Sequence, residues 1–133
     1  MITAVDTSVL IAIAKHESDA HAWVEVLAAA NSDGDLVICD VVAAEYYALL
    51  QSEDLFRDSL GALGITFSAT SLESAQLAGS IFKRYRREGG PREHLIADFL
   101  IGAHAQVQAD RMAAIDRGYL RRYFPSLRVL KPS

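Results

Sequence analysis

Short apolar runs alternate along the chain with longer stretches in which apolar residues recur every three or four positions. The short runs have the length of buried strands and lie at residues 2–5, 36–39, 65–67, 111–115 and 127–130. The longer stretches predict helices at 8–14, 20–30, 41–51, 52–63, 71–88 and from about 94 to 109, with a break at Gly89-Gly90-Pro91. Apolar strands that alternate with helices are typical of a parallel sheet covered on both faces. The pattern therefore predicts an α/β fold of three layers, α/β/α, around a mostly parallel sheet of four to five strands.

Acidic residues follow these predicted strands. Asp6 comes directly after the first strand, and Asp116 comes directly after the fourth. Glu45 lies a little over one turn into the helix that follows the second strand, and Asp98 lies in the first turn of the helix that ends near residue 109. Right-handed crossovers bring the carboxyl ends of parallel strands to one edge of the sheet, where ligands bind. We therefore expect the four carboxylates to meet at that edge.

A cluster of four carboxylates favours a metal ion. Carboxylates that share a cleft repel one another, and burial disfavours their charged forms, so a divalent cation would remove this cost. Oxygen ligands without His or Cys nearby suit Mg²⁺, or Mn²⁺, better than Zn²⁺. Such an ion can activate water and stabilise the charge that develops on a phosphodiester under attack.

Each acid also has a purely structural interpretation. Asp6 and Asp116 could cap the helix or turn that follows them, and Asp98 could interact with its helix dipole. Glu45 is harder to explain in this way, because its neighbours along the helix are apolar and an unpaired acid among them is costly. The functional interpretation rests on the four acids arriving at one edge.

Composition narrows the class of protein. The 133 residues are 51% apolar and 23% charged, which indicates one globular domain spanning residues 1–133. No apolar run is long enough to cross a bilayer, and the N-terminal run lacks a basic flank, so we expect a cytoplasmic protein with no membrane contact. The single Cys39 excludes an internal disulfide.

The charge is unevenly distributed, although the net value is only −4. Residues 1–82 carry two basic and twelve acidic residues, whereas residues 83–133 carry eleven basic and five acidic ones. This asymmetry indicates an anionic partner, and a solvated helix face is the alternative. The candidate nucleic-acid contacts are Arg84, Arg87, Arg117, Arg121 and Arg122.

Four motifs together resemble a known family. They are Asp6-Thr-Ser8-Val-Leu-Ile, Ala44-Glu45, Arg92 with Asp98-Phe-Leu-Ile-Gly-Ala-His104-Ala, and Asp116-Arg-Gly-Tyr-Leu-Arg-Arg-Tyr-Phe-Pro125. In this order they resemble a PIN domain, and more narrowly the VapC toxins of bacterial toxin–antitoxin pairs. The resemblance covers essentially the whole chain.

This resemblance implies a Mg²⁺-dependent endoribonuclease, usually a homodimer, that a cognate VapB-type antitoxin silences. It maps the catalytic, metal-binding quartet of the family onto Asp6, Glu45, Asp98 and Asp116. Ser8 matches a small polar position that could bind metal through water or orient Asp6.

Two further positions bear on the resemblance. Arg92 matches a basic residue that would contact phosphate or pair with the carboxylates. The family commonly has Thr or Ser two residues before the fourth acid, and Ala114 occupies that position here. The lost hydroxyl leaves open a catalytically impaired PIN-like module that only binds RNA or protein. A phosphatase of the haloacid dehalogenase type is a weaker alternative, because it needs a second Asp where this chain has Ser8.

Overall fold

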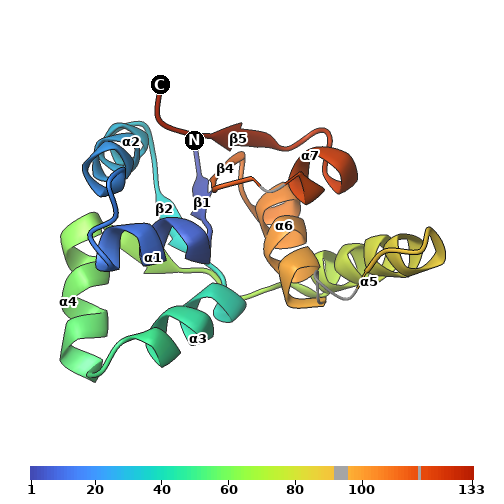
Figure 1. Ribbon diagram of the computed structural model, residues 1–133, viewed down its shortest axis with the longest axis horizontal. Helices are drawn as coiled ribbons and strands as arrows, with labels where there is room; N and C mark the ends of the chain where they lie inside the picture. Colours follow the sequence, from blue (N-terminus) through green and yellow to red (C-terminus); the bar gives the residue numbers. More distant parts are fainter. Residues whose placement is uncertain (92–95, 117) are drawn as a thin grey trace.

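The computed structural model describes residues 1–91, 96–116 and 118–133, and shows one five-stranded sheet surrounded by helices (Figure 1). The strand order is β3-β2-β1-β4-β5, and each neighbouring pair is parallel. The strands are β1 (Thr3–Val5), β2 (Leu36–Ile38), β3 (Ile65–Phe67), β4 (Arg111–Ala113) and β5 (Arg128–Leu130). The predicted parallel sheet is confirmed, with five strands.

Seven helices are present in the described part of the chain, and with the sheet they form the predicted three-layer α/β/α arrangement. They are α1 (Thr7–Ala14), α2 (Ala20–Ser32), α3 (Asp40–Leu49), α4 (Glu53–Leu63), α5 (Leu72–Arg87), α6 (Ile96–Gln108) and α7 (Tyr119–Tyr123). In Figure 1, α1 to α4 gather on the left and α5 packs along α6 on the right. No described helix has the length and apolar character needed to cross a membrane.

Local chemistry sets the helix boundaries. Ser52 and Ser71 accept hydrogen bonds from the backbone N–H groups of Leu55 (3.0 Å) and Ser74 (3.1 Å), which satisfies amides at the starts of α4 and α5. Gly64 ends α4 in the left-handed conformation, at φ 73°. Helix α2 runs two residues beyond its predicted end at residue 30, because Ser32 continues the helix and donates to the carbonyl of Ala29.

The three inner strands form the centre of the core. Every residue of β1, β2 and β4 is buried, whereas the edge strands β3 and β5 are partly exposed. Cys39 is buried as expected, and the buried His104 forms a hydrogen bond with the Ser68 hydroxyl at 3.0 Å. Both residues therefore have a structural place in the core.

The topology places a binding edge between β1 and β4. The chain proceeds from β1 outward to β2 and β3, then crosses back to β4 on the other side of β1 and ends at β5. Ligands of open parallel sheets bind at the carboxyl ends of the strands where the order changes direction in this way. The Asp6 N–H donates to the Ala113 carbonyl at 2.9 Å, so the two strand ends are joined at that point.

Candidate active site

A cavity of about 780 Å³, here called the acidic cavity, opens at this edge of the sheet. Three of the four predicted acids, Asp6, Glu45 and Asp98, line it together with Ser8. The remaining lining residues are Thr7, Ile11, Ala48, Leu49, Ile101, Ile115 and Tyr119. The described lining therefore carries three carboxylates and no basic side chain.

Asp6 is both a helix cap and a cavity residue. Its carboxylate accepts hydrogen bonds from the Ser8 N–H at 3.3 Å and from the Ser8 hydroxyl, and so caps α1. Burial raises the pKa of the Asp6 carboxyl, and the charge of Glu45 raises it further, against the opposing hydrogen bonds from Ser8 and Thr7. The Ser8 hydroxyl also accepts from the Ile115 N–H at 3.2 Å, so it fixes Asp6 relative to the segment after β4.

Glu45 reaches the acidic cavity from α3 and is held by α1. Its carboxylate accepts a hydrogen bond from the Thr7 hydroxyl at 2.6 Å. The expectation that Glu45 lies in an apolar, costly environment is wrong, because the residue is exposed and paired. Thr7 is a site residue that sequence reasoning did not single out, since its contact with Glu45 depends on how α1 packs against α3.

Asp98 and Tyr119 complete the acidic cavity from the opposite side. Asp98 is half-buried in the first turn of α6, and Tyr119 begins α7 with its ring packed edge-on against Phe99. Burial raises the pKa of the Tyr119 hydroxyl, and the charges of Asp6, Asp98, Asp116 and Glu45 raise it further. Tyr119 is therefore a neutral side chain that experiences the charge of all four acids.

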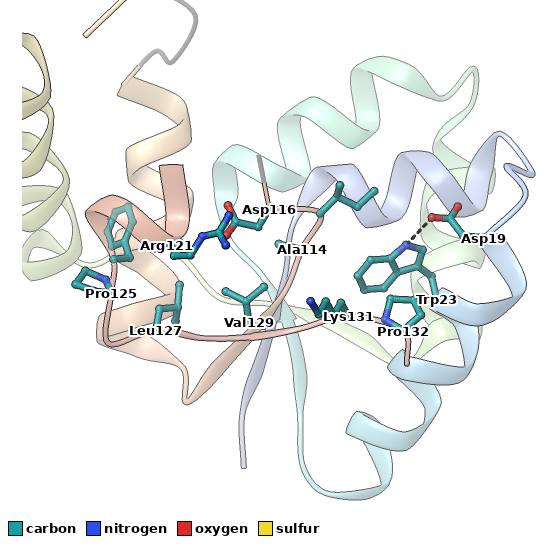
Figure 2. Close-up of a pocket in the computed structure, with 12 residues that line it drawn as sticks. Asp19, Trp23, Ala114, Asp116, Arg121, Pro125, Leu127, Val129, Lys131 and Pro132 are labelled. Atoms are coloured by element: carbon teal, nitrogen blue, oxygen red, sulfur yellow. Dashed lines mark hydrogen bonds between the residues drawn. The ribbon is translucent and has the colours of Figure 1, made fainter. Parts of the chain in front are cut away.

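Asp116 lies next to the acidic cavity and lines a different one. Strand β4 ends at Ala113, so residues 114–116 form a loop, in which the Asp116 carboxylate accepts from the Gly118 N–H at 2.8 Å. The cavity that Asp116 lines is here called the β5 cavity and measures about 520 Å³ (Figure 2). Ile115 lines both cavities.

The basic residues with candidate roles lie in several places. Arg121 lines the β5 cavity, and Figure 2 shows its side chain extending toward Asp116. Arg84 and Arg122 both place their guanidinium carbon over the Tyr123 ring, at 5.3 and 5.4 Å from its centroid. Arg87 is exposed in the last turn of α5. Arg92 and Arg117 lie outside the described residues.

The donor set of the acidic cavity suits a hard divalent cation. Asp6, Glu45 and Asp98 supply oxygen ligands, and the raised pKa of Asp6 indicates a carboxylate that a positive charge would stabilise. Within the described residues, no three His, Cys, Asp or Glu side chains are arranged as a ready-made metal-binding group. Mg²⁺ commonly uses only one or two carboxylates with water and substrate phosphate, so the residues present fit such an ion.

The comparison with protein families identifies the chain. A family model of the PIN domain matches residues 3–124, and the chain therefore belongs to the PIN domain family. The family expectation drawn from the sequence motifs is confirmed. A search among curated proteins finds no match.

Solved structures with the same fold cover nearly the whole chain. VapBC2 from Rickettsia felis, bound to a DNA fragment from its promoter, matches with a TM-score of 0.70 and 20% identity over 98% of both chains. VapBC-1 from nontypeable Haemophilus influenzae matches with a TM-score of 0.71 and 16% identity over 98% of both chains. FitAcB from Neisseria gonorrhoeae matches with a TM-score of 0.62 and 21% identity, over 99% of this chain and 98% of the other. At these identities the likeness shows the fold alone.

Proposed function

We propose that this PIN domain is the toxin of a toxin–antitoxin pair and acts as an endoribonuclease that needs Mg²⁺ or Mn²⁺. PIN domains are generally nucleases, which supports a hydrolase acting on nucleic acid. The observation that carries the proposal is the acidic cavity, where Asp6, Glu45 and Asp98 converge at the β1–β4 edge of the sheet.

The cation would be held by one or two of the carboxylates of Asp6, Glu45 and Asp98, with water completing its coordination. When bound, it would activate water and neutralise charge on the phosphodiester. Ser8 orients Asp6, and Thr7 orients Glu45. The neutral Tyr119 hydroxyl adds a polar group to a cavity whose other described polar side chains are the three acids and two hydroxyls.

The proposed partners are RNA, a VapB-type antitoxin and a second copy of the chain. VapBC and FitAcB complexes share this fold, which supports an antitoxin partner. Exposed apolar side chains on α3 and α4, namely Tyr47, Leu49 and Leu55, provide surface for protein contacts, and Leu49 also lines the acidic cavity. We place the activity in the cytoplasm, where such pairs would meet RNA.

Cleavage of a structured RNA in the presence of Mg²⁺, repeated with EDTA, tests the proposal. We expect cleavage that stops with EDTA and resumes when Mg²⁺ or Mn²⁺ is added in excess. Asp6→Asn should abolish cleavage and remain folded, whereas Asp58→Asn, at an exposed acid of α4, should cleave normally. Cleavage that survives EDTA, or full activity of Asp6→Asn, would exclude the carboxylate–metal mechanism.

A second candidate function is binding of RNA or protein without cleavage. Asp116 lies outside the acidic cavity, and Ala114 lacks the hydroxyl that commonly precedes the fourth acid, so the site is less compact than the motif implies. The same assay distinguishes the two functions. A protein that retains labelled RNA but leaves it intact with both Mg²⁺ and Mn²⁺ has the second function.

A further inference from the structure

We propose that the β5 cavity binds a nucleoside of the RNA substrate, the one next to the phosphate that is cleaved in the acidic cavity. This inference rests on the proposed function and adds a subsite to it. The proposal rests on a second cavity that shares a lining residue with the acidic cavity, and whose volume and lining suit a nucleoside.

The position of the β5 cavity suits an adjacent nucleotide. Ile115 contributes to both cavities, and the loop of residues 114–116 separates them. Ile115 is 37% exposed, so the residue that lines both cavities reaches solvent. A strand whose phosphate lies over Asp6 would therefore pass directly to the β5 cavity on this side.

The walls of the β5 cavity suit the flat, apolar face of a base. Leu127, Val129 and Pro125 line it together with the buried Trp23 and Phe124, and in Figure 2 Trp23 lies at one end, beside Pro132. Its volume of about 520 Å³ falls within the roughly 300–1,000 Å³ typical of small-ligand sites. Hydrophobic contact with such aliphatic walls is non-directional, so it would not require one base.

The charges of the β5 cavity suit the phosphate backbone attached to that nucleoside. Arg121 and Lys131 are both exposed and line the cavity, whereas the described lining of the acidic cavity has no basic residue. Asp19, whose carboxylate accepts from the Trp23 indole N–H at 3.3 Å, lines the cavity beside Trp23 and could also accept from the edge of a base. Asp116 also lines the cavity, so its charged lining is two cations and two carboxylates, which can contact the phosphates and the base edge of a nucleotide beside the apolar walls.

The first test measures binding without cleavage. Asp6→Asn protein is titrated into a labelled single-stranded RNA of ten nucleotides, and into a ten-unit ribose–phosphate chain that lacks all bases. Val129→Trp, made in the same background, fills the cavity. We expect it to weaken binding of the RNA about fivefold or more, the effect of losing one base contact, and to leave the base-free chain unchanged.

Matched variants control for damage to the fold. Arg128→Trp places the same bulk on β5 at an exposed residue outside the cavity lining. It also removes one positive charge, so any loss of binding should be equal for the RNA and the base-free chain. If Val129→Trp does not fold, Lys131→Glu at the exposed rim replaces it, with Arg128→Glu as its control. Lys131→Glu should weaken RNA binding by more than Arg128→Glu does.

The second test uses the wild-type enzyme and an RNA whose cleaved bond has been mapped. Removing the base on one side of that bond should lower kcat/KM, and Val129→Trp should show no further loss on the base-free substrate, because both changes remove one interaction. Independent, additive losses would overturn the proposal. Normal RNA binding by Val129→Trp would also overturn the proposal. If that variant binds RNA normally and changes only self-association, the cavity takes a second copy of the chain instead of a nucleoside. If the wild type cleaves no RNA, the proposed function fails, and the binding test still decides the subsite.

Discussion

The hydrogen bond between Thr7 and Glu45 allows activity to be separated from stability. Thr7 is 9% exposed, and its hydroxyl lies 2.6 Å from a Glu45 carboxylate oxygen. Thr7→Val keeps the shape of the side chain and removes the hydroxyl, whereas Thr7→Ser keeps the hydroxyl and removes a methyl group. Both variants should therefore lose stability, and only Thr7→Val should lose activity.

The size of each effect follows from the surroundings of the two groups. A hydrogen bond to a charged acceptor contributes about 1.5–3 kcal/mol when it is buried. Glu45 is exposed, so water compensates for part of this contribution. Loss of the hydrogen bond should therefore cost about 1 kcal/mol, which corresponds to a rate lower by about fivefold. The buried methyl group of Thr7 contributes about 1 kcal/mol to folding, which corresponds to a thermal midpoint lower by about 3–5 °C in a chain of this size.

Single-turnover cleavage and thermal unfolding measure the two effects on the same preparations. We expect Thr7→Val to cleave about fivefold more slowly and to melt about 3–5 °C lower, because the hydrogen bond that holds Glu45 in the cavity also contributes to folding. We expect Thr7→Ser to melt earlier and to cleave at close to the wild-type rate. Wild-type activity in Thr7→Val would show that the orientation of Glu45 does not limit the reaction.

Two further predictions concern stability. Because burial raises the pKa of Asp6, the folded protein holds this proton more tightly than the unfolded chain, and the free energy of unfolding should fall as the pH rises above the ordinary Asp value of 3.8. With EDTA present to remove divalent cations, the free energy of unfolding of Asp6→Asn should equal that of the wild type below that pH and exceed it at pH 7. Equal free energies of unfolding in both ranges would contradict the burial of the Asp6 charge. A Cβ added at Gly102 would lie 2.5 Å from the ring of the fully buried Phe124, so Gly102→Ala should destabilise the protein by about 1–2 kcal/mol in denaturant titrations. Gly79→Ala in α5, where nothing lies within 4 Å of the added atom, should instead stabilise it by about 0.5–1 kcal/mol, and a loss of stability there would refute the packing argument.

The fold was predictable because its signals are local. Apolar runs give the strands, and cap residues such as Ser52 and Ser71 give helix starts that the structure confirms. The sheet edge that collects Asp6, Glu45 and Asp98 followed from the handedness of the crossovers.

The finer arrangement of the site was not predictable, because it depends on packing and strand length. The fourth strand was expected to run to Ile115, but β1 offers only Thr3–Val5 as pairing partners, so β4 ends at Ala113. The residues left over form the loop that directs Asp116 toward the β5 cavity. The role of Thr7 was not predicted, because the sequence does not show whether a hydroxyl at the start of a helix faces water or a carboxylate from another helix.

The pairing of β1 with β4 has a consequence for synthesis of the protein. Asp6 leaves the ribosome early, yet Ile115 and Tyr119, which line its cavity, come more than a hundred positions later. A nascent chain that ends before β4 has no partner for the Asp6 N–H, no Ile115 wall and no Tyr119. The full lining of the acidic cavity therefore forms only after nearly the whole chain has emerged, and a chain that ends before β4 would lack the proposed active site.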